Sequence, residues 1–269
     1  MGTAFNIASP TAESPFTHQI TAGVTRQVGA NYALSGDYIY MRGEHFPITS
    51  NPNARRADGT FPLIAAGTRL QLYNDTAPMR IHQAQVRLQK RFANHLGFLA
   101  GYTVGSAQTI ANNGTPSDNY NFMADWGPTN NDVRHRFVGN VIYELPFDIQ
   151  IGGIVSANTA PPYNVTTGAD VNRDGVNNDR PTGVAFNAAR GDRYFQTDLR
   201  LSKQVVFGVF RGEVLWEMFN VFNTVNLNNY QGNQASAPGV TSTGIPTGFG
   251  QPRQAFDAFQ GQLGIKLTF

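Results

Sequence analysis

The last stretch of the chain, Phe259 to Phe269, alternates between apolar and polar residues. Its apolar members share one face of an extended chain: Phe259, Leu263, Ile265, Leu267 and Phe269. A period of two is typical of a strand with one face in water, and about ten tilted residues suffice to cross the hydrocarbon core of a bilayer. The pattern therefore predicts a transmembrane strand whose apolar face meets lipid. An amphipathic strand of a soluble sandwich is the alternative at this point.

The same alternation recurs along the whole chain. It predicts further strands over residues 17–27, 32–42, 79–92, 96–104, 133–145, 149–158, 195–205 and 209–222. Short turns alternate with long loops rich in Gly, Pro, Asn and Asp, and the first long loop runs from Gly43 to about Pro78. Outer-membrane barrels alternate short periplasmic turns with long extracellular loops in this way. We therefore predict an all-β fold, an antiparallel transmembrane β-barrel or partial barrel of about 9–10 strands.

The number of strands bears on whether such a barrel is complete. Single-chain bacterial barrels have an even number of strands, whereas the pattern gives about nine. If the last strand ends on the periplasmic side, the first clear strand runs toward the periplasm and its neighbour is expected upstream of this chain. A marginal strand within Thr3 to Ser9 is the alternative source of an even number.

Composition excludes one class of membrane protein. The chain has 269 residues, of which 14% are charged, and it lacks the run of ~20 apolar residues that a spanning helix needs. A helical membrane protein is therefore excluded. The absence of cysteine is compatible with an oxidising compartment. The opening residues 1–15 have neither the basic nor the apolar region of a secretory signal, so we expect a mature chain or the C-terminal piece of a longer protein.

Several segments resemble a known family. In order along the chain they read SPFTHQITAGVTRQVGANYALSGDYIYMRG, QAQVRLQKRF, DWGPTNNDVRHRFVGNVIYELP, PPYNVTTGADVNRDGVNNDRP, FQTDLRLSK, EMFNVFNTVN, FGQPRQAF and LGIKLTF. Together they are similar to the C-terminal barrel segment of Oar-like TonB-dependent outer-membrane receptors. The resemblance implies a plugged barrel of about 22 strands. Residues 1–269 would then be a single β-barrel unit, the C-terminal part of a larger barrel, with the plug, the TonB box and the N-terminal domain absent.

The function implied by this resemblance is substrate uptake or surface binding at the bacterial outer membrane. The expected partners are outer-membrane lipid, the barrel-assembly machinery acting through the C-terminal strand, and TonB only if a plug lies upstream. No nucleic acid is expected. The alternative function is that of a self-contained small barrel, either a passive pore or an adhesive surface protein. The resemblance does not identify the substrate, because in this family loops and the plug largely determine it.

The sharpest chemical motif lies between Asp170 and Asp179. Carboxylate or amide oxygens alternate along it, and Gly175 at the sixth position permits a sharp turn, an arrangement that suits Ca²⁺ in a single loop. The predicted calcium ligands are the side chains of Asp170, Asn172, Asp174 and Asp179 and the carbonyl oxygen of Val176. Pro181 stands where a full EF-hand loop has a bidentate Glu. A cluster of Asx turns that cap their own backbone is therefore the alternative.

Asp132, Arg134, His135 and Arg136 form a second polar group, and we expect Arg134 and Arg136 to face the barrel lumen. The expected partners of the two arginines are Asp198, Glu213, Glu217 or other carboxylates across the wall. The five histidines are scattered without the spacing of metal ligands, so a metal role for His135 is not expected. Neither a Gly-x-Ser-x-Gly elbow nor a phosphate-binding glycine loop is present. The sequence thus gives no catalytic residues, and we do not expect an enzyme.

Aromatic residues lie mostly toward the ends of the expected strands. Tyr and Trp at such positions anchor a barrel at the level of the lipid headgroups, so we interpret them as girdles and not as a ligand cage. Arg26, Lys90 and Lys203 fall near the expected periplasmic turns. We expect these three cations to reach toward lipid phosphates or water.

Overall fold

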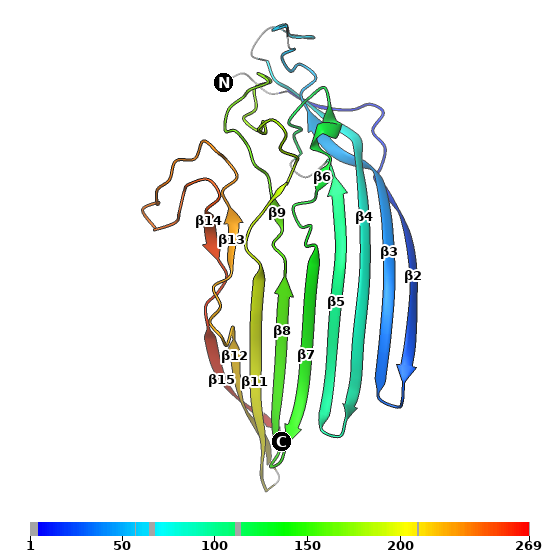
Figure 1. Ribbon diagram of the computed structural model, residues 1–269, viewed down its shortest axis with the longest axis vertical. Coiled ribbons are helices and arrows are strands. Elements are labelled where there is room, and N and C mark those ends of the chain that lie inside the picture. Colours follow the sequence, from blue (N-terminus) through cyan, green and yellow to red (C-terminus); the bar gives the residue numbers. More distant parts are fainter. Residues whose placement is uncertain (1–4, 57, 65–67, 111–113, 209, 269) are drawn as a thin grey trace.

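The computed structural model describes residues 5–56, 58–64, 68–110, 114–208 and 210–268, and one large sheet dominates it (Figure 1). The long strands are β2 (Phe16–Val28), β3 (Tyr32–Ser50), β4 (Leu70–Ala93), β5 (Leu96–Thr109), β7 (His135–Leu145), β8 (Ile149–Asn158), β11 (Tyr194–Phe207), β12 (Phe210–Phe219) and β15 (Gln260–Thr268). The short strands are β1 (Phe5–Ala8), β6 (Gly127–Pro128), β9 (Pro162–Tyr163), β10 (Ala189–Arg190), β13 (Leu227–Tyr230) and β14 (Pro252–Ala255). The described residues include a 3-10 turn, η1 (Phe122–Asp125), and none of their helices is long and apolar enough to cross a membrane.

The long strands follow one another edge to edge in the order β15-β12-β11-β8-β7-β5-β4-β3-β2, with antiparallel neighbours. Short turns join them at the lower end of Figure 1, and long loops join them at the upper end. In the β4–β5 turn, Asn94 and His95 both have positive φ, 52° and 62°, which the tightest hairpin turns require. The predicted antiparallel transmembrane sheet with short periplasmic turns and long extracellular loops is confirmed. Within the described residues the sheet is open at β2 and β15.

The strand register gives the sheet two chemically different faces. On one face, a row across five strands reads Val86, Tyr102, Phe137, Ala157 and Phe195. On the other face, the adjacent row reads Gln85, Thr103, Arg136, Asn158 and Tyr194. A barrel in a membrane turns its apolar side chains to lipid and its polar ones to the lumen. We therefore call the first the lipid face and the second the lumenal face.

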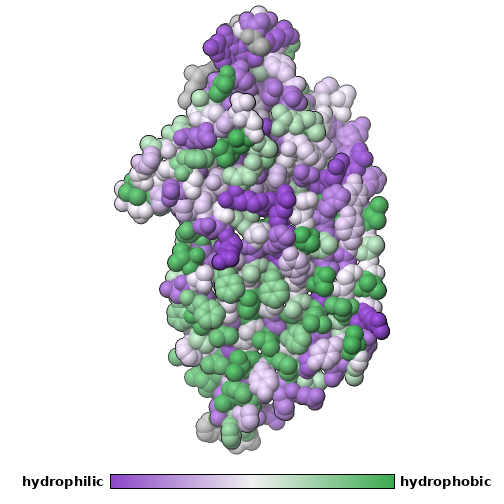
Figure 2. Space-filling view, viewed as in Figure 1, coloured by the Kyte–Doolittle hydropathy of each residue, from purple (hydrophilic) through white to green (hydrophobic). Residues whose placement is uncertain are grey.

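Aromatic side chains mark both ends of the lipid face. On β3, Tyr32 lies at the periplasmic end and Tyr40 lies eight residues further along the same face. Eight residues span about 26 Å along a strand, close to the height of the apolar band of a barrel, about 25 Å. Tyr32 packs edge-on against Phe98, with 6.4 Å between the ring centroids. Figure 2 shows hydrophobic side chains gathered over the strands in the lower part of the molecule and hydrophilic ones over the loops above.

The expectation that Lys90 reaches lipid phosphates or water is wrong. Its side chain turns back over the β4–β5 hairpin, where the ammonium donates to the carbonyl oxygens of Ala93 (2.6 Å) and Leu96 (2.5 Å). Only 8% of the residue is exposed. Carbonyl groups left free at a turn that lies beside the membrane need donors, and this lysine supplies them.

The first long loop is shorter than the sequence pattern predicted. Instead of ending near Arg42 and restarting at Met79, β3 continues to Ser50 and β4 begins at Leu70. The upper part of β3 does not alternate between apolar and polar residues, because two register shifts interrupt its pairing with β4. They lie between Gly43 and Phe46 and between Phe46 and Ile48. This upper part is held by a small core above the membrane, in which Phe46, Phe122 and Trp126 pack on the buried residues Ile48, Ala77 and Ile110.

Two further expectations concern the chain ends. The expected marginal strand exists as β1, but it pairs in parallel with the upper part of β4, Phe5 opposite Leu70. It is therefore not the extra wall strand that would make the number even, because wall strands of such barrels are antiparallel. At the other end, Phe269 lies outside the described residues.

The strand β12 stops at Phe219 and not at Phe222, because Asn220 takes a φ of 49° and its side-chain oxygen accepts a bond from the Thr224 N–H.

Candidate functional site

A pocket of about 510 Å³ lies on the lumenal side of the extracellular mouth. Its floor comes from the wall, where Asn158 at the end of β8 is paired with Tyr194 at the start of β11. Its sides come from the two long loops above: β9 pairs with β10, and β13 pairs with β14. A bridge between Thr166 and Asn233 joins the two loops. Segments far apart in the sequence are thus brought together over the upper end of the sheet (Figure 1).

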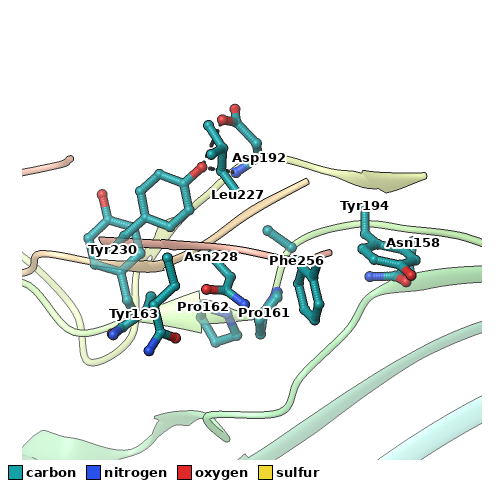
Figure 3. Close-up of a pocket in the computed structure, with 13 residues that line it drawn as sticks. Asn158, Pro161, Pro162, Tyr163, Asp192, Tyr194, Leu227, Asn228, Tyr230 and Phe256 are labelled. Carbon is teal, nitrogen blue, oxygen red and sulfur yellow. Dashed lines mark hydrogen bonds between the residues drawn. The ribbon is translucent and has the colours of Figure 1, made fainter. Parts of the chain in front are cut away.

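Aromatic rings line much of this pocket (Figure 3). Tyr163 and Tyr230 stack nearly parallel, with 5.6 Å between their centroids and 15° between their planes. Tyr194 and Phe256 meet edge to face, with 5.1 Å between centroids. Gly191 makes room for the first pair, because a Cβ atom there would lie 2.1 Å from Cε2 of Tyr230. Figure 3 shows the tyrosine pair at one end of the pocket and Tyr194 with Asn158 at the other.

Several polar side chains also line the pocket, and Tyr230 and Asp192 are held to each other by hydrogen bonds. The Tyr230 hydroxyl donates to Oδ2 of Asp192 at 2.7 Å and accepts a bond from the Asp192 backbone N–H at 3.0 Å. Burial, and then the bond to the Asp192 carboxylate, raise the pKa of the Tyr230 hydroxyl. Among the described residues, the side-chain oxygen of Asn228 is a buried acceptor without a hydrogen-bond partner. The pocket therefore offers ring faces for stacking and one free acceptor.

This arrangement suits the binding of a small ligand. Mostly apolar pockets with a few placed polar groups are the usual form of small-molecule sites. Among the described residues no group of three or more His, Cys, Asp or Glu side chains is arranged to hold a metal ion. Sequence reasoning missed the pocket, because Tyr163, Tyr230 and Phe256 come from loop segments with no period and only Tyr194 belongs to a wall strand. The one available signal was the pairing of rings with prolines, as in Pro161, Pro162 and Tyr163.

The segment from Asp170 to Asp179 lies in the loop between β9 and β10. Oδ1 of Asp170 accepts from the Asp174 N–H at 2.9 Å, and Oδ2 of Asp179 accepts from the Val171 N–H at 2.6 Å. Oδ1 of Asn172 also accepts from the Asp174 N–H, at 3.0 Å. These bonds are those of the Asx-turn alternative. Burial, and then the charges of Asp170 and Asp179, raise the pKa of Asp174, so the carboxylates of the motif do repel one another.

The expected ion pairs of Arg134 and Arg136 are wrong. Glu213 and Glu217 are paired with Arg200, at 3.0 Å and 3.5 Å. Arg134 is instead 3.4 Å from Asp132, two residues away. Among the described residues Arg136 has no ion pair with any of the three carboxylates expected. The reason is the register: β11 and β12 are direct neighbours, so Arg200 lies opposite Glu217, whereas β7 is separated from β12 by two strands.

Three solved structures illustrate what the fold resembles. The match with the outer membrane transporter YddB from Escherichia coli covers 99% of this chain and 34% of YddB, with a TM-score of 0.59 and 12% identity. The ferric-catecholate import receptor Fiu from E. coli matches 94% and 27%, with a TM-score of 0.53 and 13% identity. The FrpB iron transporter from Neisseria meningitidis matches 97% and 32%, with a TM-score of 0.55 and 10% identity. This chain therefore spans about a third of their length, and the likeness is one of fold.

A search of curated protein sequences gave no match. A family comparison did: residues 1–189 match the outer membrane beta barrel domain. That match covers most of the sheet, from β1 to the start of β10. It agrees with the apolar lipid face and with the outer-membrane proteins of similar fold, and it locates the chain in the bacterial outer membrane. The chain belongs to the outer membrane beta barrel domain family.

Proposed function

We propose that this chain is the C-terminal barrel segment of an Oar-like TonB-dependent receptor, which takes up or binds a small ligand at the cell surface. The observation that carries the proposal is the position of the aromatic pocket. It lies on the lumenal side, directly above the polar lumenal face, where a ligand from outside meets the barrel first. The likeness to proteins described as an outer membrane transporter and a ferric-catecholate import receptor supports an uptake role.

The open sheet supports the larger barrel over the self-contained one. Within the described residues the outer edges of β2 and β15 have no partner strand. An unpaired backbone group in hydrocarbon costs several kcal/mol, so further strands must cover these edges in the membrane. The neighbours of similar fold are about three times as long. A small closed barrel, acting as a passive pore or an adhesive surface protein, is the competing proposal.

The two proposals differ in permeability and in partners. The full-length protein, reconstituted in liposomes, should not let small sugars pass, because a plugged receptor has no open channel. In cells, it should cross-link to TonB, with a strain lacking TonB as the control. Rapid swelling that depends on sugar size, without a TonB cross-link, would instead establish the passive pore.

The C-terminal strand carries a separate proposal about assembly. The lipid-facing side chains Leu263, Ile265 and Leu267 are among the most exposed apolar residues, at 80%, 74% and 67%. We propose that the barrel-assembly machinery reads this strand together with Phe269, which lies outside the described residues. Deleting Phe269 should lower the amount of folded protein in the outer membrane, measured against the parent by heat-shifted electrophoresis.

We also propose that the segment from Asp170 to Asp179 binds Ca²⁺ and thereby orders the loop between β9 and β10. The predicted ligands are Asp170, Asn172, Asp174 and Asp179 with the Val176 carbonyl oxygen. Three carboxylates within ten residues support the proposal, because a divalent cation would relieve their mutual repulsion. The Asx-turn bonds formed by the same oxygens favour the alternative.

A further inference from the structure

A second hollow, of about 660 Å³, lies on the lipid face at the extracellular ends of β5, β7, β8 and β11. Two rows of lipid-facing side chains build much of it, and Asp192, Thr224 and Val225 also line it. The lower row reads Tyr102, Phe137, Ala157 and Phe195. The upper row lies nearer the loops and begins with His135 and Thr159, which two hydrogen bonds hold together. The Thr159 N–H donates to the His135 carbonyl oxygen at 3.0 Å, and the His135 N–H donates to Oγ1 of Thr159 at 3.1 Å. Arg193, two residues before Phe195, ends the upper row.

The lower row is apolar and the upper row is polar, as are the acyl chains and the headgroup of a lipid. The lower row is aromatic and aliphatic, and Tyr102, Phe137 and Phe195 are each about two fifths exposed, at 43%, 38% and 38%. The upper row offers an imidazole, a hydroxyl and a guanidinium. Nδ1 of His135 is bonded to the Tyr102 hydroxyl at 2.7 Å. When that hydroxyl donates, the imidazole hydrogen lies on Nε2, which is then free to donate to a ligand.

Two arginines line this hollow: Arg136, whose position belongs to the lumenal face, and Arg193. Arg190 and Arg134 are paired with Asp132, and Arg42 is paired with Glu44. Among the described residues, Arg193 is exposed and has no ion pair. The neighbouring carboxylate of Asp192 borders the hollow, but it is bonded to the Tyr230 hydroxyl in the lumenal pocket. The hollow therefore holds a cation, Arg193, that makes no ion pair with any described residue.

We propose that this hollow binds a phosphorylated glycolipid of the outer leaflet, lipid A, with a phosphate on Arg193 and His135 and acyl chains over the aromatic row. The chain is an outer-membrane protein, and its long loops mark this end of the sheet as the extracellular one. The lipid layer at that level is rich in lipid A, whose phosphates lie at the boundary between sugar and acyl chains. A guanidinium forms strong, paired hydrogen bonds with phosphate oxygens, and basic hollows beside membrane-spanning segments recognise anionic headgroups.

The test measures lipid retained by the full-length protein, purified from outer membranes and examined by native mass spectrometry. The probes are diphosphoryl lipid A, lipid A with both phosphates removed, and phosphatidylglycerol. The parent should retain diphosphoryl lipid A best. Arg193→Gln should weaken its retention about tenfold, since a charge-assisted hydrogen bond contributes on that scale, and Arg193→Lys should recover most of it.

Lys203→Gln is the matched control. Lys203 lies on the lipid face of β11, ten residues after Arg193 and nearer the periplasm, so its replacement should leave lipid A retention unchanged. Heat-shifted electrophoresis checks that every variant is folded. Equal retention by the parent and Arg193→Gln would overturn the proposal. So would equal retention of dephosphorylated lipid A, and equal retention of phosphatidylglycerol would overturn the assignment to lipid A.

Discussion

The wall of the barrel and the loops above it are held together by different forces. In the wall, β7 and β8 pair over ten successive positions through backbone bonds, and the side chains only select lipid or lumen. In the loops, side chains form many of the long-range bonds, beside the short strand pairs β9–β10 and β13–β14. The Arg180 guanidinium is bonded to the Asp125 carboxylate, to the Ala124 carbonyl oxygen at 2.7 Å and to the Ser117 hydroxyl at 3.1 Å. The wall is thus specified by a repeating pattern, and the loops by single residues.

Buried asparagines show the same dependence of the loops on single side chains. Asn53 is 1% exposed; its amide donates to the carbonyl oxygens of Ile64 and Thr68, and its oxygen accepts from the Leu63 N–H at 3.0 Å. Asn220, 2% exposed, joins its own turn to the segment before β15 through the Asp257 carbonyl oxygen at 3.1 Å. An amide both donates and accepts, so one such residue satisfies several buried backbone groups of an irregular segment. One substitution in a loop should therefore matter more than one in the lumenal face of the wall.

The largest effect is expected at the Arg180–Asp125 pair, whose side chains are 10% and 5% exposed. Asp125→Ala leaves a buried guanidinium without its carboxylate, which typically costs about 3–5 kcal/mol. The loss should appear as faster hydrogen exchange in residues 115–126 and 176–186, with the wall strands unchanged. Asp257→Ala, at an exposed loop position, is the control and should change little. Exchange that accelerates equally in β7 and β8 would show that loops and wall are one cooperative unit.

A somewhat smaller effect should separate the two faces of the wall. Val86→Arg or Ile265→Arg puts a charge toward lipid and should destabilise the protein by about 2–4 kcal/mol near the midplane of the bilayer. Gln85→Arg or Gln262→Arg, on the lumenal face, should cost much less. Unfolding from lipid vesicles by urea measures all four variants. Equal costs on the two faces would contradict the lipid and lumenal assignment.

The contrast also explains what the sequence revealed. The nine long strands and their turns were predictable, because lipid on one side and a polar lumen on the other impose a period of two. The pocket was not, because Tyr163 and Tyr230 come from separate loops and meet only through a bridge such as Thr166 to Asn233. Lys90 was misjudged for a related reason: its partners are carbonyl groups of a turn, which no side-chain pattern displays. The parallel pairing of β1 likewise depends on where β4 extends above the membrane.

The smallest effect concerns the segment from Asp170 to Asp179, and it depends on pH. Because the folded loop raises the pKa of Asp174 above its ordinary value of 3.8, it binds a proton more tightly than the unfolded loop does. The stabilisation of the folded loop by Asp174 is therefore complete below pH 3.8 and is lost as the pH rises through the raised pKa. Without calcium, protease cleavage between Tyr163 and Arg193 should thus become faster as the pH rises from below 3.8 through the raised pKa of Asp174.

Calcium should oppose that loosening if the motif holds the ion. At neutral pH, millimolar Ca²⁺ should slow cleavage of the parent and release or absorb heat in a calorimetric titration, because the cation offsets the repulsion among Asp170, Asp174 and Asp179. Asp174→Asn, which removes the charge and keeps the shape, should lose both the pH dependence and the calcium effect. If the parent shows neither heat nor protection, the Asx-turn bonds alone account for the segment and the calcium proposal is wrong. The wall should stay folded in every condition, because no described residue of its strands bonds to the three carboxylates.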